Sequence, residues 1–327
     1  MTSKFPHPVI CRVLAGALLA TAGLAFAQPT PFPTRALRIV VPTSPGSGSD
    51  ITARYFGEQL ATALGQPVIV DNKAGANGVL AAMTVKQAPA DGYTIFLGTN
   101  THMAVNPIVV KDLAYDALKD FKPVAGLARG MMIFVTSPTS KMNNINDLVS
   151  AAQQSKQQLN VGTYTSGFQL SAEWFASVTK TKFVNVPYKG APEVFLGVMG
   201  EQLDWAVSDL IAAMPQVKAG KLKALAVSGE KRHPDALEIP TIKESGFPEY
   251  VNYTWTSLYI RSETPDAITT KLVDAMQKIL ATPGAKEFTA KIGSDPMPLP
   301  PADMRKFQIK EIERFKAIAD GAGIKPL

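Results

Sequence analysis

Short, β-branched apolar runs alternate along this chain with segments that repeat their apolar residues every three to four positions. The apolar runs lie at 37–42, 67–72, 93–99, 131–137, 159–164, 183–188, 203–209 and 222–228. A strand that is apolar at nearly every position needs cover on both faces, and helices between the strands supply it. The alternation therefore predicts an α/β fold with parallel-dominated sheets flanked by helices.

The intervening segments carry helix start signals. Asp50 precedes a one-faced apolar pattern over 51–64 and is the expected N-cap of that helix. Thr264 followed by Pro265 predicts another helix start, because proline is favoured at the first helical position. A last amphipathic helix is expected from about residue 301 to 319.

The chain of 327 residues is longer than a typical domain of about 100–150 residues, so two lobes are expected. The strand runs at 124–137 and 251–260 are placed where the chain would cross between them. We therefore predict a first lobe from 28–128, a second from 129–249, and a return to the first over 250–327.

Residues 1–27 have the pattern of a cleavable secretory signal. Lys4 and Arg12 precede an apolar run from 13 to 27 that ends in the small residues Ala25 and Ala27. The alternative is a membrane anchor, but this run is shorter than the roughly 20 residues needed to span a bilayer. The pattern predicts export and cleavage after Ala27.

Composition excludes several classes of function. The one cysteine, Cys11, lies in the signal segment, so the exported chain has no disulfide, thiol nucleophile or thiolate metal site. Without Lys4 and Arg12 it has 31 basic and 27 acidic residues and no basic cluster, so no nucleic-acid partner is expected. Metal-binding and cofactor motifs are also missing from the sequence, so neither a metal nor a cofactor is expected.

Three loops of small polar residues follow predicted strands. The first and third along the chain lead into predicted helices, whose free N-terminal amides bind anions without a basic side chain. In open α/β sheets, ligands sit at such strand ends. The three loops therefore predict one cleft for a small anion; their residues are Ser44, Gly46, Ser47, Gly48 and Ser49 in the first, Gly98, Thr99, Asn100 and Thr101 in the second, and Gly162, Thr163, Thr165, Ser166 and Gly167 in the third.

The anion is not expected to be a phosphate. The first loop lacks the lysine of a phosphate-binding loop, and Ile51 stands where a dinucleotide fingerprint needs its third glycine. The acidic Asp50 would also repel a polyanion, whereas a carboxylate is easier to accommodate. Asp50 itself has two interpretations, helix capping alone or contact with the ligand.

An alternative from another class is a secreted hydrolase that uses Ser44 or Ser166 with His102. The sequence has no GxSxG motif around either serine, and the other histidine after the signal segment, His233, lies in a polar stretch. A third interpretation is a surface interaction protein with an empty cleft. The scarcity of catalytic groups favours a ligand that is held over one that reacts.

Several stretches of the chain resemble, in order, the motifs of one known family. They read "RIVVPTSPGSGSDITAR", "LGQPVIVDNKAGANGVLAA", "APADGYTIFLGTNTHMAVNP", "VPYKGAPEVFLGVMGEQLDWAVSD" and "IPTIKESGFPEYVNYTWTSLYIRSETP". They resemble the Bug family, the periplasmic solute receptors of tripartite tricarboxylate transporters. The resemblance covers essentially the whole chain after the signal segment.

This resemblance implies a two-lobe periplasmic binding protein of type II-like, Venus-flytrap architecture. Such a receptor captures a small organic carboxylate between its lobes and delivers it to the membrane subunits of the transporter. It implies a monomer in the periplasm that is not an enzyme.

The resemblance also implies which residues bind the ligand. Tyr164 and Phe168 stand where the family commonly has small residues, so we expect an aromatic or longer-chain carboxylate. The full implied set is Ser44, Gly46, Ser47, Gly48, Ser49 and Asp50 in the first loop; Thr99, Asn100, Thr101 and His102 in the second; and Thr163, Tyr164, Thr165, Ser166, Phe168, Gln169 and Asp209 in the far lobe.

Overall fold

The computed structural model describes residues 1–2, 32–324 and 326, and it divides into two compact units, 1–34 and 35–327. The account below concerns the second unit. The predicted cleavage site after Ala27 and the predicted start of the first lobe at residue 28 lie outside the described residues. Within the described part of the chain, no helix has the length and apolar character that crossing a membrane requires.

The first group of strands forms a parallel sheet in which β1 lies between β2 and β3. Helices α2 and α3 connect these strands, as the alternating pattern predicts. Four of the five residues of β1 are buried, so it needs cover on both faces. The elements are β1 (Leu37–Val41), α2 (Gly48–Leu64), β2 (Val68–Asn72), α3 (Val79–Lys86) and β3 (Thr94–Thr99).

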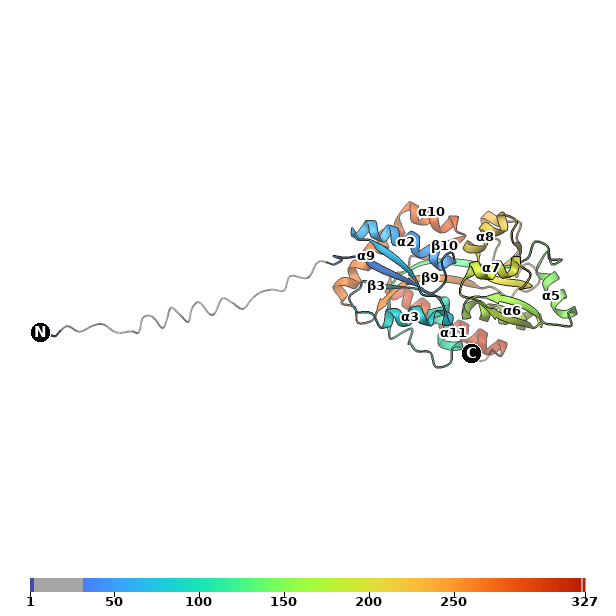
Figure 1. The fold of residues 1–327 in the computed structure, drawn as a ribbon, viewed down its shortest axis with the longest axis horizontal. Coiled ribbons are helices and arrows are strands. Elements are labelled where there is room, and N and C mark those ends of the chain that lie inside the picture. The colour runs from blue at the N-terminus through green and yellow to red at the C-terminus, as the bar shows by residue number, and fades with distance from the viewer. Residues whose placement is uncertain (3–31, 325, 327) are drawn as a thin grey trace. The chain divides into compact units, whose positions relative to one another are not determined.

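The second group repeats this arrangement, with β5 pairing in parallel with both β6 and β7. Figure 1 shows α2, α3 and α9 near the strands of the first group and α5–α8 near those of the second. The elements of the second group are α5 (Ile145–Gln154), β5 (Leu159–Thr163), α6 (Ser166–Thr179), β6 (Phe183–Pro187), α7 (Ala191–Met199), β7 (Trp205–Asp209), α8 (Leu210–Lys218) and β8 (Lys223–Val227).

Two long antiparallel strands, β4 (Phe121–Thr136) and β9 (Tyr253–Arg261), join the groups. The first part of β4 pairs with β9, and its last residues pair with β7 and β8. The strand order is β2-β1-β3-β9-β4-β7-β5-β6. The antiparallel pairs of the described chain all include β4 or β9, and the parallel pairs lie within the two groups. The predicted α/β class is confirmed.

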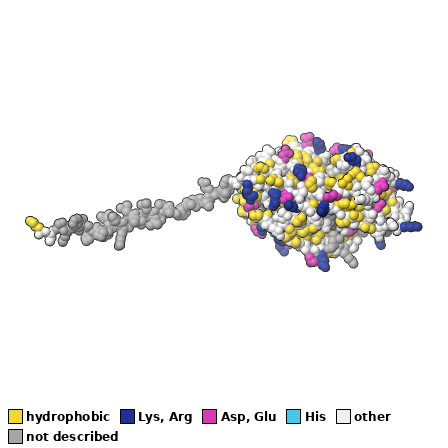
Figure 2. Space-filling model, in the orientation of Figure 1, with side chains coloured by type: hydrophobic (Ala, Val, Ile, Leu, Met, Phe, Trp, Pro, Cys, Tyr) yellow, Lys and Arg dark blue, Asp and Glu magenta, His cyan; other side chains and the backbone are white. Residues whose placement is uncertain are grey.

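The C-terminal segment returns to the first group of strands. Its last helix packs against β4, and Phe315 on that helix is buried in the same apolar cluster as Phe96 and Phe121. Its elements after β9 are α9 (Asp266–Ala281), α10 (Pro283–Lys291), β10 (Ser294–Pro296) and α11 (Pro301–Ala322). Lysine, arginine and acidic side chains are interspersed on the face of this unit that Figure 2 shows.

Two helix starts differ from the sequence prediction. Helix α2 begins at Gly48, with Ser47 as N-cap in an extended conformation, so the assignment of Asp50 as N-cap was wrong. Helix α9 has Pro265 as its N-cap rather than as its first residue. Both helices start close to the predicted positions, because capping signals mark a boundary only to within a turn.

A second apolar cluster, around Phe175, provides a test of the fold. Phe175 is fully buried, and its ring centroid lies 5.1 Å from that of Phe134 and 5.9 Å from that of Trp205. We expect Phe175→Ala to lower the free energy of unfolding by about 3–5 kcal/mol, because it leaves a cavity. Urea denaturation measures this loss.

The matched control is Leu196→Ala on α7, since the Leu196 side chain is 67% exposed. Its effect is expected to stay within about 0.5 kcal/mol. Equal effects of the two substitutions would contradict the described packing.

Candidate functional site

The three predicted loops meet around one cavity, together with β4 and β9. The first loop reaches it at the start of α2, the second just after β3, and the third at the start of α6. The lining residues are Thr43, Gly48, Ser49, Thr52, Thr99, Asn100, Thr101, His102, Ala128, Gly130, Tyr164, Thr165, Phe168, Asp209, Ile211, Thr254, Trp255, Thr256 and Ser294.

The N-terminus of α2 forms one wall of the cavity. Thr43 Oγ1 and Ser49 Oγ lie 2.7 Å apart and share a hydrogen bond. The Gly48 amide donates to Asp209 Oδ2 at 3.4 Å, which connects α2 to the second group of strands. A Cβ atom at position 48 would lie 2.6 Å from Asp209 Cγ, so only glycine fits this close approach.

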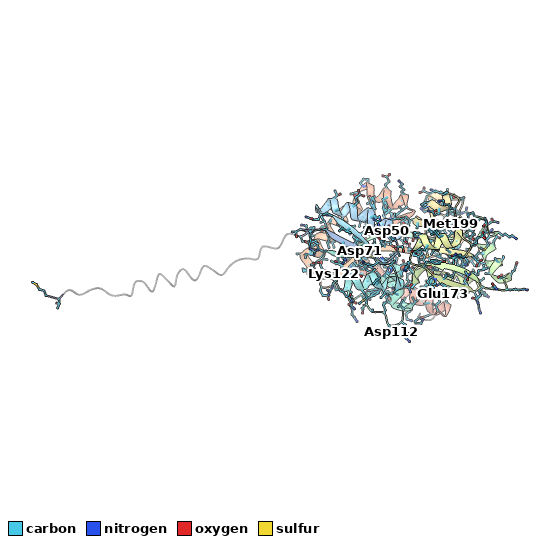
Figure 3. All side chains as sticks on the ribbon, viewed as in Figure 1. Asp50, Asp71, Asp112, Lys122, Glu173 and Met199 are labelled. Carbon is cyan, nitrogen blue, oxygen red and sulfur yellow. The ribbon has the colours of Figure 1, made fainter. Side chains whose placement is uncertain are left out.

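Asp50 lies behind this wall rather than in it. Its buried carboxylate accepts hydrogen bonds from the Gly46 amide at 2.9 Å, Asn72 Nδ2 at 3.0 Å and Arg54 Nε at 3.0 Å. Burial alone would raise the pKa of Asp50, but these hydrogen bonds outweigh it and hold the pKa below its ordinary value. Figure 3 labels Asp50, which lies in the first turn of α2. The carboxylate holds the loop in place, much as a capping residue does.

The loop before α2 is also held by the start of α7 and the residues just before it. The Ala191 amide donates to Ser47 Oγ at 3.0 Å, and the Ser44 amide donates to the Lys189 carbonyl at 3.2 Å. A Cβ atom at Gly190 would lie 2.6 Å from Ser44 Cβ, so the two segments are in close contact. The first loop is therefore fixed by hydrogen bonds from both groups of strands.

His102 lies in the second loop, on the short helical turn η2 (Thr101–Val105), and is fully buried. Its Nδ1 lies 2.9 Å from Thr99 Oγ1, and its Nε2 has no hydrogen-bond partner within the described residues. Burial lowers the pKa of His102 to about 3. The imidazole is therefore neutral at physiological pH.

The serines of the hydrolase alternative are bonded elsewhere. Ser44 Oγ donates to Glu193 Oε1 at 3.1 Å, and Ser166 Oγ donates to Asn106 Oδ1. The hydroxyl partner of His102 is Thr99 instead. The pairing of nucleophile and base that an activated serine needs is not formed here.

The third loop brings two aromatic rings to the cavity. Thr165 is the N-cap of α6 and accepts a hydrogen bond from the Phe168 amide, and its Oγ1 lies 3.0 Å from Thr101 Oγ1 of the second loop. The ring centroids of Tyr164 and Phe168 lie 4.5 Å apart. Both rings are part of the cavity wall, where they offer an apolar surface.

Asp209 caps α8 and lies beside the start of α2. It accepts hydrogen bonds from the Ala212 amide at 3.0 Å and from the Tyr164 hydroxyl. Burial raises the pKa of Asp209, and the hydrogen bonds offset only part of this rise. Burial and the nearby Asp209 charge also raise the pKa of Tyr164, so its hydroxyl stays protonated and remains a donor.

The structure brings only part of the predicted set together. Ser44 and Ser47 bind the first turn of α7, Thr163 donates to Asn185, and Gln169 donates to Glu173. Ligand contact by these residues remains a prediction. Those in the cavity wall are Gly48, Ser49, Thr99, Asn100, Thr101, His102, Tyr164, Thr165, Phe168 and Asp209; those outside it are Ser44, Gly46, Ser47, Asp50, Thr163, Ser166 and Gln169.

Sequence reasoning missed the contribution of the two joining strands. On β9, Thr254, Trp255 and Thr256 are all among the lining residues, while the Trp255 indole donates to Glu311 on α11. The alternation of threonines in "YTWTS" was the available signal, because hydroxyl groups on a central strand need polar neighbours. The other missed residues are Thr43, Thr52, Ala128, Gly130, Ile211 and Ser294.

The Asp50 interactions predict a pH-dependent loss of stability. We expect Asp50→Asn to lower the free energy of unfolding by about 1–3 kcal/mol at neutral pH, because it weakens three hydrogen bonds to a buried carboxylate. Since the folded pKa lies below the ordinary 3.8, this contribution is present above that value and is lost as pH falls through the folded pKa. Urea denaturation at several pH values measures it.

Asp112→Asn is the matched control for this experiment, because Asp112 is exposed. It removes the same charge, and its left-handed φ of 51° suits asparagine. A loss of stability in Asp50→Asn that is no larger than in this control would contradict the bracing role.

The chain is similar in sequence to one protein family and to several bacterial proteins. Residues 52–324 match the model of the "Tripartite tricarboxylate transporter family receptor" family. A UPF0065 protein of Bordetella pertussis is 30% identical over 323 residues, which cover 98% of this chain and 99% of that protein. The protein BugT of the same organism is 28% identical over 320 residues, which cover 96% of this chain and 98% of that protein.

Three solved structures are also similar. Rpa4515 of R. palustris with adipate has a TM-score of 0.87 and 32% identity, over 91% of this chain and all of that one. The periplasmic binding protein BugD has a TM-score of 0.86 and 25% identity, over 90% of this chain and 100% of that one. MatC from Rhodopseudomonas palustris with bound malate has a TM-score of 0.83 and 27% identity, over 88% and 99%.

Proposed function

The chain belongs to the tripartite tricarboxylate transporter receptor family, and we propose that it delivers a small organic carboxylate to the membrane subunits of such a transporter. Members of this family are periplasmic solute-binding receptors. The chain is accordingly a receptor and not an enzyme, as the family motifs predicted. Cleavage after Ala27 and action as a monomer are parts of the proposal.

One observation supports a carboxylate as the ligand: the N-termini of two long helices, α2 and α6, meet at one cavity. Their amides and the partial positive charge of each helix end attract an anion without a basic side chain. Hydroxyl groups of Ser49, Thr101 and Thr165 line the same space as further donors. The similar structures with adipate and malate hold carboxylates, which supports the same ligand class here.

The aromatic wall supports an extended or flat ligand. Tyr164 and Phe168 line the cavity with their aromatic rings 4.5 Å apart. A hydrogen bond to a charged group contributes about 1.5–3 kcal/mol, so a few of them with modest apolar burial suffice for micromolar affinity. We therefore propose an aromatic or longer-chain carboxylate rather than a compact one.

Closure of two lobes would enclose the ligand. We propose that residues 28–128 and 250–327 form one lobe and 129–249 the other, with β4 and β9 as the crossing strands. The contacts of the first loop with Lys189 and Ala191 would then form on closing, since they join the two groups. A ligand that touches both lobes favours the closed form, which the membrane subunits would recognise.

A carboxylate screen tests the proposed function. We expect at least one aromatic or longer-chain carboxylate to raise the melting temperature of the mature protein, with saturable binding in calorimetry and no product formed. A ligand at 100 times its dissociation constant adds about 2.7 kcal/mol of stability. Tight binding of aspartate or glutamate, with none of any longer or aromatic acid, would overturn the proposed ligand class.

Gly48→Ala tests where the ligand is held. The added Cβ would lie 2.6 Å from both Asp209 Cγ and Ile211 Cγ2, so the start of α2 must move away from these two residues. We expect the affinity for a carboxylate found in the screen to fall at least about tenfold, or 1.4 kcal/mol. Calorimetry compares this variant with Gly321→Ala, where a Cβ meets no atom within 4 Å. Wild-type affinity in Gly48→Ala would place the ligand elsewhere.

A further inference from the structure

The cavity wall has one carboxylate and no basic side chain among its described residues. Asp209 is the acidic residue of the wall, and neither a lysine nor an arginine lines the cavity alongside it. His102 is neutral, because burial holds its pKa far below physiological pH. The fixed charge that a ligand meets here is therefore negative.

Asp209 has hydrogen-bond partners but no counterion. Its described partners are the Gly48 amide, the Ala212 amide and the Tyr164 hydroxyl, all of them neutral donors. The Gly48 contact, at 3.4 Å, is long for a hydrogen bond. A buried carboxylate without a cation carries a desolvation cost that neutral donors offset only in part. The raised pKa of Asp209 is consistent with this cost.

The surroundings of Asp209 suit a cation. Tyr164 and Phe168 line the same cavity, and aromatic ring faces attract an ammonium group when it is shielded from water. Tyr164 both contacts Asp209 and presents its ring to the cavity. A carboxylate beside aromatic rings is a common way to bind a positively charged nitrogen.

We propose that Asp209 is a specificity-determining residue that selects a ligand carrying a cationic nitrogen in addition to its carboxylate. This inference rests on the proposed function and narrows its ligand class to long-chain or aromatic amino-carboxylates. The ligand carboxylate uses the helix N-termini, and its ammonium group is the counterion of Asp209. A dicarboxylate would instead bring two further negative charges into a cavity without a basic residue, where like charges repel strongly.

Matched ligand series test this selection by calorimetry at neutral pH on the mature wild-type protein. The first series is 6-aminohexanoate, hexanoate and adipate. The second is 4-(aminomethyl)benzoate, 4-methylbenzoate and terephthalate. Within each series the carboxylate and the frame are constant while the far group is cationic, neutral or anionic. In a series that binds, we expect the amino member to bind at least about tenfold tighter than the dicarboxylate.

The Asp209→Asn substitution removes the negative charge of this side chain and leaves its size nearly unchanged. The asparagine oxygen can still accept from the Ala212 amide, so the cap of α8 is retained. We expect the preference for the amino member to fall to about threefold or less in this variant, because the counterion is gone. Asp112→Asn, at an exposed position, removes a charge outside the cavity and is expected to keep the wild-type preference.

The outcomes separate this inference from the proposed function. If a dicarboxylate binds the wild-type protein as tightly as its amino partner, or if Asp209→Asn keeps the preference, the charge pairing is wrong while carboxylate capture stands. If no member of either series binds and the wider screen also fails, the proposed function itself is wrong. The comparison of amino-carboxylate and dicarboxylate binding by the wild-type protein tests the charge pairing even if Asp209→Asn does not fold.

Discussion

The contact between the start of α2 and the second group of strands is the constraint on which the site depends. The Gly48 amide meets Asp209, and Ser47 accepts from the Ala191 amide, so residues far apart in sequence form one wall. These bonds exist only where the two groups of strands lie together. A ligand that favours the arrangement in which the two groups meet therefore also favours this contact. A receptor that closes on its ligand needs such a coupling between the ligand and the arrangement of its parts.

Around this contact the polar groups have distinct tasks. Asp50 holds the first loop from behind, and Arg54 and Asn72 keep its carboxylate ionised. Asp209 faces the cavity with neutral donors only, so burial dominates its titration. The pKa values of these two carboxylates thus shift in opposite directions, because Asp50 has a cationic partner within the protein and Asp209 does not.

The sequence anticipated the fold better than the site. Runs such as 37–42 and 159–164 became strands within a residue or two, because apolar β-branched periodicity is a local property. The Ser/Gly loops were placed at the cavity for the same reason, since strand ends and helix starts are locally encoded. Thr254 and Trp255 were not expected there, because the local sequence pattern does not encode where β9 lies relative to these loops.

By itself, the sequence determined the alternation of strands and helices, the family and the residue types available for binding. The tertiary structure alone decided which of those residues face the cavity, because that depends on how β4 and β9 bring two parallel sheets together. It turned Ser44, Ser47 and Asp50 toward protein partners and left Asp209 in the wall without a counterion. Side-chain partners across such distances follow from packing, which no local pattern encodes.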